Sequence, residues 1–291
     1  MLSLHRLRAV FFAVITLAIA GACTAGEGQP EPAPVAVEPV SVDQIDDTAD
    51  AACEEPAAPQ APPPADAAVD TPDAETCPEG MILVEGEYCP VVRQDCARWL
   101  EDPDVFSYAR CAEYEPFQIC LAPRQHKRFC IDKDEYTPPG AELPAAHQSW
   151  RDARGICQAQ GKRLCQESEW EFACEGEQML PYPYGLVRDP EICNFDQQDL
   201  YKPDGSLRDM REPGEARPRC ESPFGVRNMV GNLDEWTLRE TSPGLHRSVL
   251  RGGWWMAARD RCRASTTAHN EIYEGPQTGV RCCSSPVAAE R

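Results

Sequence analysis

The residues of this chain best suited to chemistry are its 16 cysteines, since a thiolate can attack a substrate, bind a soft metal ion or enter a disulfide. Fourteen of them follow residue 76, an even number that would allow each to be paired. Metal binding is the competing use, but no Cys-x-x-Cys pair occurs and the five histidines are scattered. The pattern therefore indicates structural disulfides, with the adjacent Cys282 and Cys283 bonded to different partners.

One of these cysteines follows a stretch that could surround a reactive group. Cys262 comes after Arg251-Gly252-Gly253-Trp254-Trp255 and is the single candidate catalytic residue there. The tryptophans are candidate contacts for a ligand, together with Trp236 and Arg259. Core packing is the alternative use of the pair, because alternation along a strand would bury one of two neighbours.

The N-terminus has the pattern of a secretion signal. Arg6 and Arg8 precede an apolar run at 9–20, which is too short to span a membrane as a helix, so we expect residues 1–22 to be a signal peptide. Small residues lead directly into Cys23, which resembles the lipobox of bacterial lipoproteins and makes Cys23 the expected lipidation residue. The alternative is ordinary cleavage after an Ala-x-Ala site with a chance cysteine nearby.

Residues 23–76 have the composition of a disordered acidic linker. Positions 24–76 contain thirteen Asp or Glu, ten Pro and thirteen Ala, and no Lys or Arg. Such a segment cannot build a core, and its prolines and mutual repulsion keep it extended. It carries most of the formal charge of -20, so no basic face for nucleic acid is apparent, and calcium is the ion that this charge could attract. Residues 77–291 are expected to form one folded domain, because they are numerous enough for a sizeable core.

Two helices are predicted in that domain. The first runs from Trp150 to about Gln160, after a Ser149-x-x-Asp152 capping pattern. The second covers 167–174, and Gln166 is a poor residue to begin it. Short apolar runs such as 81–84 and 248–250 predict short strands separated by long loops. The fold class is therefore α+β, with little regular structure and many disulfides.

Several motifs of the domain resemble those of formylglycine-generating enzymes, in the same order along the chain. The matching segments are Ser149-Trp150-Arg151-Asp152-Ala153, Gly161-Lys162-Arg163-Leu164, Glu167-Ser168-Glu169-Trp170-Glu171-Phe172, Pro183-Tyr184-Gly185, Gly231-Asn232-Leu233-Asp234-Glu235-Trp236, Arg251-Gly252-Gly253 and Gly279-Val280-Arg281. The resemblance spans roughly 78–285 and identifies the domain as a member of the sulfatase-modifying-factor superfamily. It implies a fold related to C-type lectins.

The resemblance also implies two disulfides. In disulfide-bonded members of the family, the cysteine near the end of the first helix pairs with the one after the final Gly-Phe-Arg, which corresponds here to Cys157 with Cys282. The cysteine that ends the second helix pairs with one just beyond the catalytic strand, which corresponds to Cys174 with Cys262. Cys165 replaces a family proline before the second helix, and a local disulfide there would support the helix start.

The copper chemistry of the family is not expected here. Formylglycine formation requires two thiols that hold Cu(I), because soft thiolates are what this ion prefers. Ala257 stands at the first thiol position, and the loop that carries the second is shortened. An alignment without the gap would place Cys262 at the second position, but one sulfur cannot make a two-thiolate site.

Calcium is the cofactor that the resemblance allows. Structural Ca²⁺ in the family is held by oxygens that correspond to Asn194, Asn232 and Glu235, with Asp209 as a further carboxylate. The alternative is that Asn232 and Glu235 only cap and hydrogen-bond the loop before Trp236.

Two classes of function follow from these observations. The first is a non-catalytic domain of a lipid-anchored protein of the cell envelope, on the outer membrane or the periplasmic face, which binds a peptide, glycan or neighbouring protein. The second is an active oxidoreductase that oxidises protein cysteines through an atypical site.

Overall fold

The computed structural model of the protein describes residues 75–240, 245–258 and 260–288, all within one compact unit, residues 67–291. The expected signal peptide 1–22, the expected lipidation residue Cys23 and positions 24–74 of the expected linker lie outside the described residues, as does Arg259. Within the described part of the chain, no helix has the length and apolar character that crossing a membrane requires.

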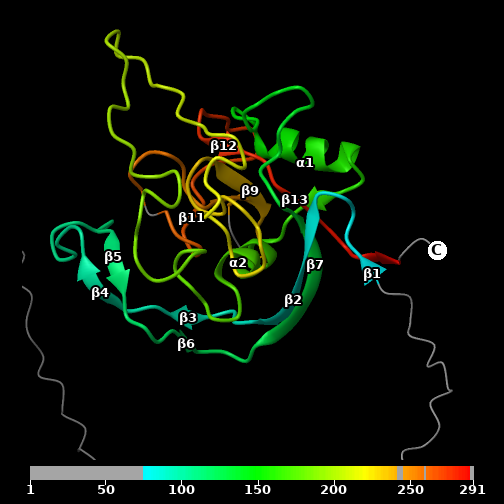
Figure 1. The fold of residues 1–291 in the computed structure, drawn as a ribbon, viewed down its shortest axis with the longest axis horizontal. Coiled ribbons are helices and arrows are strands. Elements are labelled where there is room, and N and C mark those ends of the chain that lie inside the picture. The colour runs from blue at the N-terminus through cyan, green and yellow to red at the C-terminus, as the bar shows by residue number, and fades with distance from the viewer. Residues whose placement is uncertain (1–74, 241–244, 259, 289–291) are drawn as a thin grey trace, which may run out of the picture. The chain divides into compact units, whose positions relative to one another are not determined.

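The first sheet is antiparallel and contains the two longest strands of the fold (Figure 1). Its order is β2-β7-β13-β8, formed by β2 (Met81–Tyr88), β7 (Gln125–Asp132), β13 (Cys282–Ser284) and β8 (Arg163–Leu164). The expected strand at 81–84 is the beginning of β2, which pairs with β7 along its whole length. Val84 and Tyr88 are buried while Glu85 and Glu87 are not, so one face of the strand covers the core.

The second sheet leads into the stretch from Arg251 to Cys262, in which the sequence places the candidate catalytic residue. Its order is β11-β10-β9-β12, with β9 (Asp234–Leu238), β10 (Ser248–Arg251), β11 (Ser265–Thr266) and β12 (Thr278–Gly279). The expected strand at 248–250 is therefore confirmed as β10. Only β12 runs parallel to its neighbour, β9.

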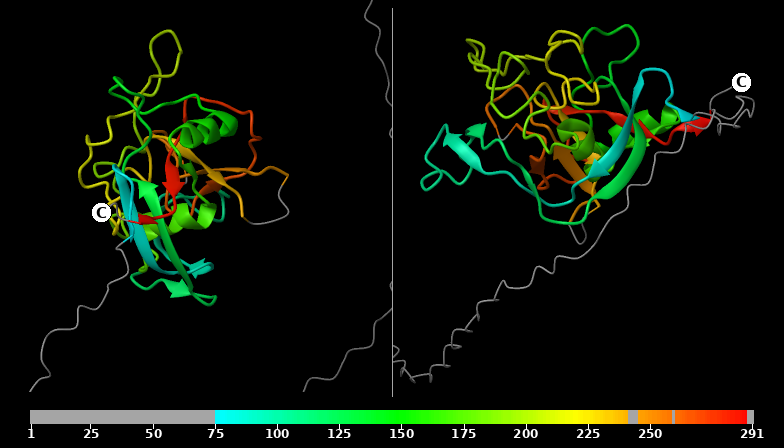
Figure 2. Two further views of the ribbon diagram at one scale, coloured as in Figure 1. Left: turned by 90° about the vertical axis from the view of Figure 1, so that its right-hand side faces the viewer. Right: turned by 60° about the horizontal axis from the view of Figure 1, so that its bottom comes forward.

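Three two-stranded sheets complete the strands. They are β1 (Glu75–Thr76) with β14 (Val287–Ala288), β3 (Val92–Arg93) with β6 (Ile119–Cys120), and β4 (Cys96–Trp99) with β5 (Cys111–Tyr114). The last two residues of the expected linker thus belong to a strand. The β4–β5 hairpin projects from the rest of the fold, at the left of Figure 1 and of the right-hand view in Figure 2.

Both predicted helices are present. The first, α1 (Trp150–Ala159), begins with the expected capping box, in which Asp152 N donates to Ser149 Oγ and Ser149 N donates to the Asp152 carboxylate. The second, α2 (Glu167–Glu175), has no cap from the side chain of Gln166. Glu240 takes over part of that role from a distant loop, because its carboxylate accepts a hydrogen bond from Ser168 N at 2.8 Å.

Helix α2 lies between the two large sheets and contacts strands of both. Its Trp170 and Phe172 are completely buried. One side of the helix also carries Glu167, Glu171 and Glu175, one turn apart. Two arginines, one in β10 and one in the loop after β10, form ion pairs with these carboxylates. Arg251 bonds Glu167 at 2.6 Å and Glu171 at 2.7 Å, and Arg263 bonds Glu175 at 2.6 Å.

All fourteen cysteines between residues 77 and 283 are in disulfides. The pairs are Cys77–Cys130, Cys89–Cys120, Cys96–Cys111, Cys157–Cys282, Cys165–Cys283, Cys174–Cys262 and Cys193–Cys220. The fourth and sixth are the two pairings that the family resemblance implies. Cys282 and Cys283 bond different partners, as expected.

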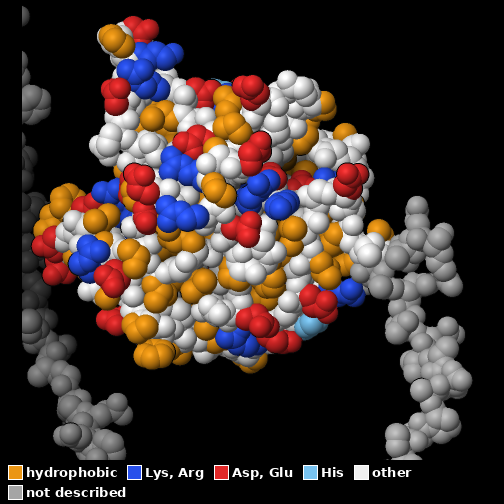
Figure 3. Space-filling view, viewed as in Figure 1, with side chains coloured by type: hydrophobic (Ala, Val, Ile, Leu, Met, Phe, Trp, Pro, Cys, Tyr) orange, Lys and Arg blue, Asp and Glu red, His pale blue; other side chains and the backbone are white. Residues whose placement is uncertain are grey.

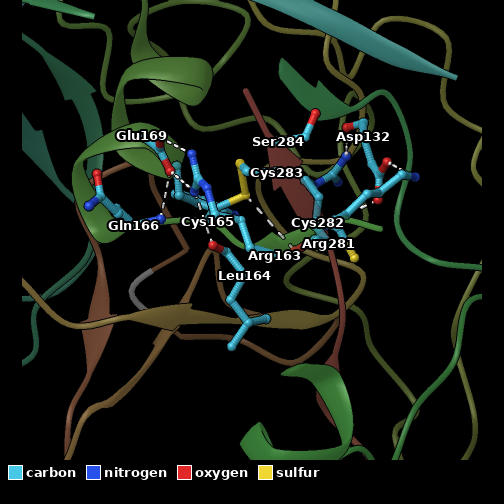
Figure 4. Close-up of a disulfide and its surroundings, with 12 residues drawn as sticks. Asp132, Arg163, Leu164, Cys165, Gln166, Glu169, Arg281, Cys282, Cys283 and Ser284 are labelled. Atoms are coloured by element: carbon cyan, nitrogen blue, oxygen red, sulfur yellow. Dashed lines mark hydrogen bonds and ion pairs between the residues drawn. A yellow bond between two sulfur atoms is a disulfide. The ribbon is translucent and has the colours of Figure 1, made fainter. Parts of the chain in front are cut away.

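We expect a local bridge from Cys165, but the observed one reaches Cys283 in β13, 118 positions along the chain (Figure 4). The bridge still supports the start of α2, because it holds the backbone next to Gln166. The N–H of Gln166 donates to the Glu169 carboxylate at 2.8 Å. The neighbouring Cys157–Cys282 bridge joins α1 to the same strand. Two adjacent disulfides therefore fasten both helices to β13.

A buried ion pair connects α2 with the two large sheets. Glu235 in β9 and Arg281 just before β13 are almost fully buried, and their side chains approach to 2.7 Å. Glu235 also accepts a hydrogen bond from Trp170 Nε1 at 2.6 Å, and Arg281 donates to the carbonyl of Asp132 at the end of β7 at 2.9 Å. The charges are thus paired and hydrogen-bonded, as burial requires.

A second buried carboxylate lies close to this pair. Glu135 accepts hydrogen bonds from Asn232 Nδ2 at 2.5 Å and from Leu233 N at 3.1 Å. Burial and the negative charge of Glu235 raise the pKa of Glu135 to about 8, against the opposing effect of Arg281. Burial likewise raises the pKa of Glu175 to about 7.

The adjacent bridges predict a dependence of one disulfide on the other. With Cys157–Cys282 intact, removing Cys165–Cys283 by a double alanine substitution frees a loop of only about nine residues, and we expect a loss of roughly 2.5 kcal/mol of unfolding free energy. In a background that lacks Cys157–Cys282, the same substitution frees a loop of roughly 30 residues and should cost about 3.5 kcal/mol. Denaturant unfolding of the four proteins measures both values, and equal losses in the two backgrounds would contradict the prediction.

Buried carboxylates with raised pKa values predict that stability falls as the pH rises. Between the unfolded pKa of Glu135, near 4.5, and its folded pKa of about 8, the folded state binds the proton more tightly, so each pH unit removes at most about 1.4 kcal/mol for this group. Glu175 acts in the same direction up to about pH 7. Calorimetry at about pH 5, 6.5 and 8 should show a falling melting temperature, with a shallower fall in Glu135→Gln. The exposed Glu142→Gln is the control, and a slope that Glu135→Gln leaves unchanged would refute the assignment.

Candidate functional site

The loop that follows β10 begins with two glycines whose backbone no other residue could easily adopt. Gly252 and Gly253 have φ values of +93° and +80°. A Cβ on Gly252 would lie 2.7 Å from the carbonyl oxygen of Met229, and one on Gly253 would lie 1.9 Å from Oδ1 of Asp260. The glycines therefore allow the loop to turn directly against the core.

The tryptophans that follow have different environments. Trp255 is 1% exposed, whereas Trp254 is half-buried and lines a cavity of about 210 Å³ with Asp234 and His269. Their ring centroids lie 4.7 Å apart. The burial of Trp255 agrees with the alternative that one of the pair packs in the core, and ligand contact by the pair stays a prediction. Trp236 is also completely buried, with its Nε1 donating to the carbonyl of Gln148 at 2.7 Å.

Neither position where the family has a copper-binding thiol offers one here. Ala257 at the first position is exposed, and Cys262, which the alignment without a gap would place at the second, is buried in its bridge to Cys174. Every cysteine in the described part of the chain is likewise in a disulfide, and a disulfide sulfur is not a thiolate. The loop therefore has no group that could perform the two-thiolate chemistry.

The end of this loop is held by a buried carboxylate. Asp260 Oδ2 accepts hydrogen bonds from Arg188 at 2.7 Å and from Ala258 N at 3.1 Å. Burial raises the pKa of Asp260 to about 6, although Arg188 opposes the shift. Arg188 also donates to the Ala258 carbonyl at 3.1 Å, so the backbone around Ala258 is fixed from both sides.

The same arginine begins a row of alternating charges that leads to the β4–β5 hairpin. Arg188 bonds Asp196 at 2.7 Å, Asp196 bonds Arg110 at 2.8 Å, and Arg110 bonds Glu101 within the hairpin. For Arg188, burial works against the charged form, but hydrogen bonding to Asp196 and the charge of Asp260 outweigh it and raise the pKa. The ion pairs thus position the hairpin relative to the loop after β10.

Between the hairpin and that loop lies a hollow of about 640 Å³, here called the hairpin groove. The residues that line it include Val105, Phe106, Tyr108, Arg110, Ala257 and Ala258. Phe106 and Tyr108 are 55% and 71% exposed, which is unusual for side chains of this size. Hydrophobic side chains are visible on the projection at the left of Figure 3, where Figure 1 places β4 and β5.

Two further hollows adjoin the hairpin groove. Tyr108 and Arg110 also line a cavity of about 440 Å³ that extends to Tyr182 and Arg261, and Ala258 also lines the cavity beside Trp254. Of the described residues that the sequence proposed for ligand contact, Trp254 lines a hollow that adjoins the groove, whereas Trp236 and Trp255 line none of these three hollows. The sequence reasoning missed Phe106, Tyr108 and Arg110, although a cluster of aromatics between two cysteines was a visible signal.

The four residues expected to hold calcium are not brought together as one site. The Glu235 carboxylate is committed to Arg281 and Trp170, and Asp209 lies on the surface in an ion pair with Arg211 at 2.6 Å. Asn194 and Asn232 do meet, at 3.0 Å, but through a hydrogen bond between their amides. The described residues contain no cluster of three His, Cys, Asp or Glu side chains arranged to hold a metal ion. Glu235 cannot bind calcium while its carboxylate neutralises Arg281, but Asn194 Oδ1 is buried without a hydrogen-bond partner among the described residues, so calcium binding stays a prediction.

Comparisons with known proteins agree with the sequence motifs. The chain is 34% identical to the inactive C-alpha-formylglycine-generating enzyme 2 of Mus musculus over 154 residues, which cover 50% of each protein. It is 32% identical to the formylglycine-generating enzyme of Bos taurus over 167 residues, 48% of this chain and 44% of that enzyme. The chain thus spans about half the length of these relatives. Among solved structures, PvdO from Pseudomonas aeruginosa aligns with a TM-score of 0.46 and 17% identity, over 74% of this chain and 97% of that one.

A family model supplies the wider match. The model described as the sulfatase-modifying factor enzyme 1-like domain matches residues 94–286, which include the hairpin, both helices and the whole second sheet. The chain therefore belongs to the family of sulfatase-modifying factor enzyme 1-like domains.

Proposed function

We propose that this protein is a non-catalytic member of its family that binds an extended peptide segment of a partner protein in the hairpin groove. The observation that carries the proposal is that exposed aromatic side chains line the groove in which the family would have a copper-binding thiol. Ala257 stands at the position of a family thiol, and the exposed rings of Phe106 and Tyr108 line the same groove.

The absence of suitable thiols supports a non-catalytic role. Oxidation of a substrate cysteine on copper needs two thiolates, and Cys262, the nearest cysteine along the chain, is bonded to Cys174. The similarity to a mouse protein whose name calls it inactive is consistent with this role. An oxidoreductase with an atypical site would need a reactive group in the hairpin groove, and the described side chains that line it are aromatic, aliphatic, hydroxyl or ion-paired.

The geometry of the hairpin favours a peptide as the ligand. Within the described residues, no strand pairs with the outer edge of β4, and Cys96 and Trp99 of this strand line the cavity that adjoins the groove at Tyr108. Aromatic rings beside such an edge provide pockets for alternate side chains of an extended chain. The Cys96–Cys111 bridge and the Arg110 ion pairs hold the hairpin in place, which lowers the entropic cost of binding.

The proposed setting is the cell envelope. Seven disulfides indicate an oxidising, extracytoplasmic compartment. We further propose that Cys23 carries the lipid that attaches the protein to a membrane and that residues 24–76 act as an acidic spacer. The spacer would hold the hairpin groove away from the membrane surface, where a neighbouring protein could reach it.

Peptide selection tests the binding site. Peptides from a displayed random library that bind the immobilised full chain are synthesised, and their Kd values are measured by calorimetry. The double variant Phe106→Ala with Tyr108→Ala should weaken binding at least tenfold, since each ring contributes on the order of 1 kcal/mol or more at a binding surface. Tyr201→Ala is the matched control, because Tyr201 is as exposed as Phe106 and lies outside the groove. Equal affinity of the double variant, or binding to a glycan array without binding to any peptide, would exclude the proposed ligand.

Alkylation tests the absence of catalysis. We expect mass spectrometry of the unreduced protein to find no alkyl label on any cysteine from Cys77 to Cys283, because all of them are in disulfides. A peptide with Cys-x-Pro-x-Arg, offered with Cu(I) and oxygen, should give no aldehyde. Ala257→Cys should give none either, since Cys262 stays bonded to Cys174. Aldehyde from the unmodified protein would show that the protein is an active oxidase, and label on Cys174 and Cys262 would contradict their disulfide.

A further inference from the structure

A cavity of about 410 Å³ lies outside the hairpin groove and shares no residue with it. Helix α1, strand β8, the end of β9 and the residue before β10 contribute to it. Three apolar side chains, Trp150, Leu164 and Leu238, and three arginines, Arg154, Arg163 and Arg247, line it together with two glutamines. Its size is within the range of cavities that bind small organic molecules.

The apolar part of the cavity is rigid. Trp150 is 6% exposed, and its Nε1 donates to the carbonyl of Thr237 at 3.0 Å, which fixes the plane of the ring. Leu164 is in β8, next to the Cys165–Cys283 bridge seen in Figure 4. The cavity therefore presents a preformed apolar surface to a ligand.

The three arginines differ in how their charge is balanced. Arg163 makes two hydrogen bonds to the Glu169 carboxylate, at 2.7 and 2.6 Å (Figure 4). Arg154 lies one helical turn after Trp150, with its guanidinium 5.8 Å from the centre of that ring. Among the described residues, neither Arg154 nor Arg247 has a carboxylate partner for its side chain.

Two carboxylates close to residues that line the cavity make hydrogen bonds elsewhere. Glu271 accepts a hydrogen bond from the backbone N of Arg247 at 2.8 Å, and Glu240 accepts one from Ser168 N. Two guanidinium groups without a carboxylate partner among the described residues thus line one cavity with an apolar surface, on a chain whose formal charge is -20. Guanidinium groups bind carboxylates through paired hydrogen bonds, and the apolar surface favours a ligand with a hydrophobic body.

We infer that this cavity binds a small organic acid, with its carboxylate between Arg154 and Arg247 and its apolar body against Trp150, Leu164 and Leu238. Arg154 and Arg247, which would bind the carboxylate, are both exposed. They can therefore be replaced without disturbing the core.

Calorimetry on the full chain tests the ligand class with three probes. The first is 3-phenylpropionate, the second is its neutral amide, and the third is inorganic sulfate. The acid should bind at least tenfold more tightly than either of the others, because only the acid combines the charge with an apolar body. Raising the salt concentration from about 50 to about 300 mM should weaken its binding severalfold.

Substitutions test the position of the site. The double variant Arg154→Gln with Arg247→Gln should lose at least tenfold in affinity for 3-phenylpropionate. Arg151→Gln is the matched control, because Arg151 is exposed on the same helix but does not line the cavity, and it should bind as the unmodified protein does. A melting temperature unchanged within about 2 °C would show that the variants are folded.

Three results would overturn the inference. They are an amide that binds as tightly as the acid, sulfate that binds as tightly as the acid, and a double variant that keeps its affinity. Failure of this site would leave the peptide-binding proposal unaffected, since the two surfaces share no residue.

Discussion

The ion pair between Glu235 and Arg281 is the contact on which the rest of the domain depends. Both side chains are almost fully buried, and removing one partner would leave an uncompensated charge that costs about 3 to 5 kcal/mol. The pair joins β9 to the segment before β13, and its hydrogen bonds reach Trp170 in α2 and Asp132 in β7. A change in the position of α2 or of either sheet would therefore break hydrogen bonds to a buried charge. Two disulfides attach both helices to β13, immediately after Arg281.

The candidate binding surface is attached to this frame through a row of charges as well as through the core, to which Cys111 and Tyr114 of β5 belong. The row Glu101, Arg110, Asp196, Arg188 and Asp260 connects the tip of the hairpin to the loop after β10. It becomes progressively more buried along its length, and buried pairs with fixed geometry are less easily disturbed by solvent and salt than exposed ones. The hairpin can therefore expose aromatic rings without losing its position.

The sequence predicted the features that depend on local patterns or on the family motifs. The capping box at Ser149 identified α1, and the motif order led to Cys157–Cys282 and Cys174–Cys262. It could not place the hairpin groove, because that surface depends on ion pairs between residues up to 86 positions apart. It could not foresee the burial of Trp236 and Trp255 for a related reason: an aromatic side chain suits a ligand surface and a core equally well, and only the fold decides between them.

The two glycines after Arg251 show why a catalytic motif can be present without its chemistry. Gly252 passes so close to the carbonyl of Met229 and the ring of Trp170 that any side chain would collide with them. Gly253 is equally restricted by Asp260. Both contacts belong to the packing of the loop on the core, and neither involves a thiol, a metal ion or a substrate. The Arg-Gly-Gly sequence is therefore a requirement of the fold, and the residues that decide between catalysis and binding are the ones beyond it, beginning with Ala257 and the bridged Cys262.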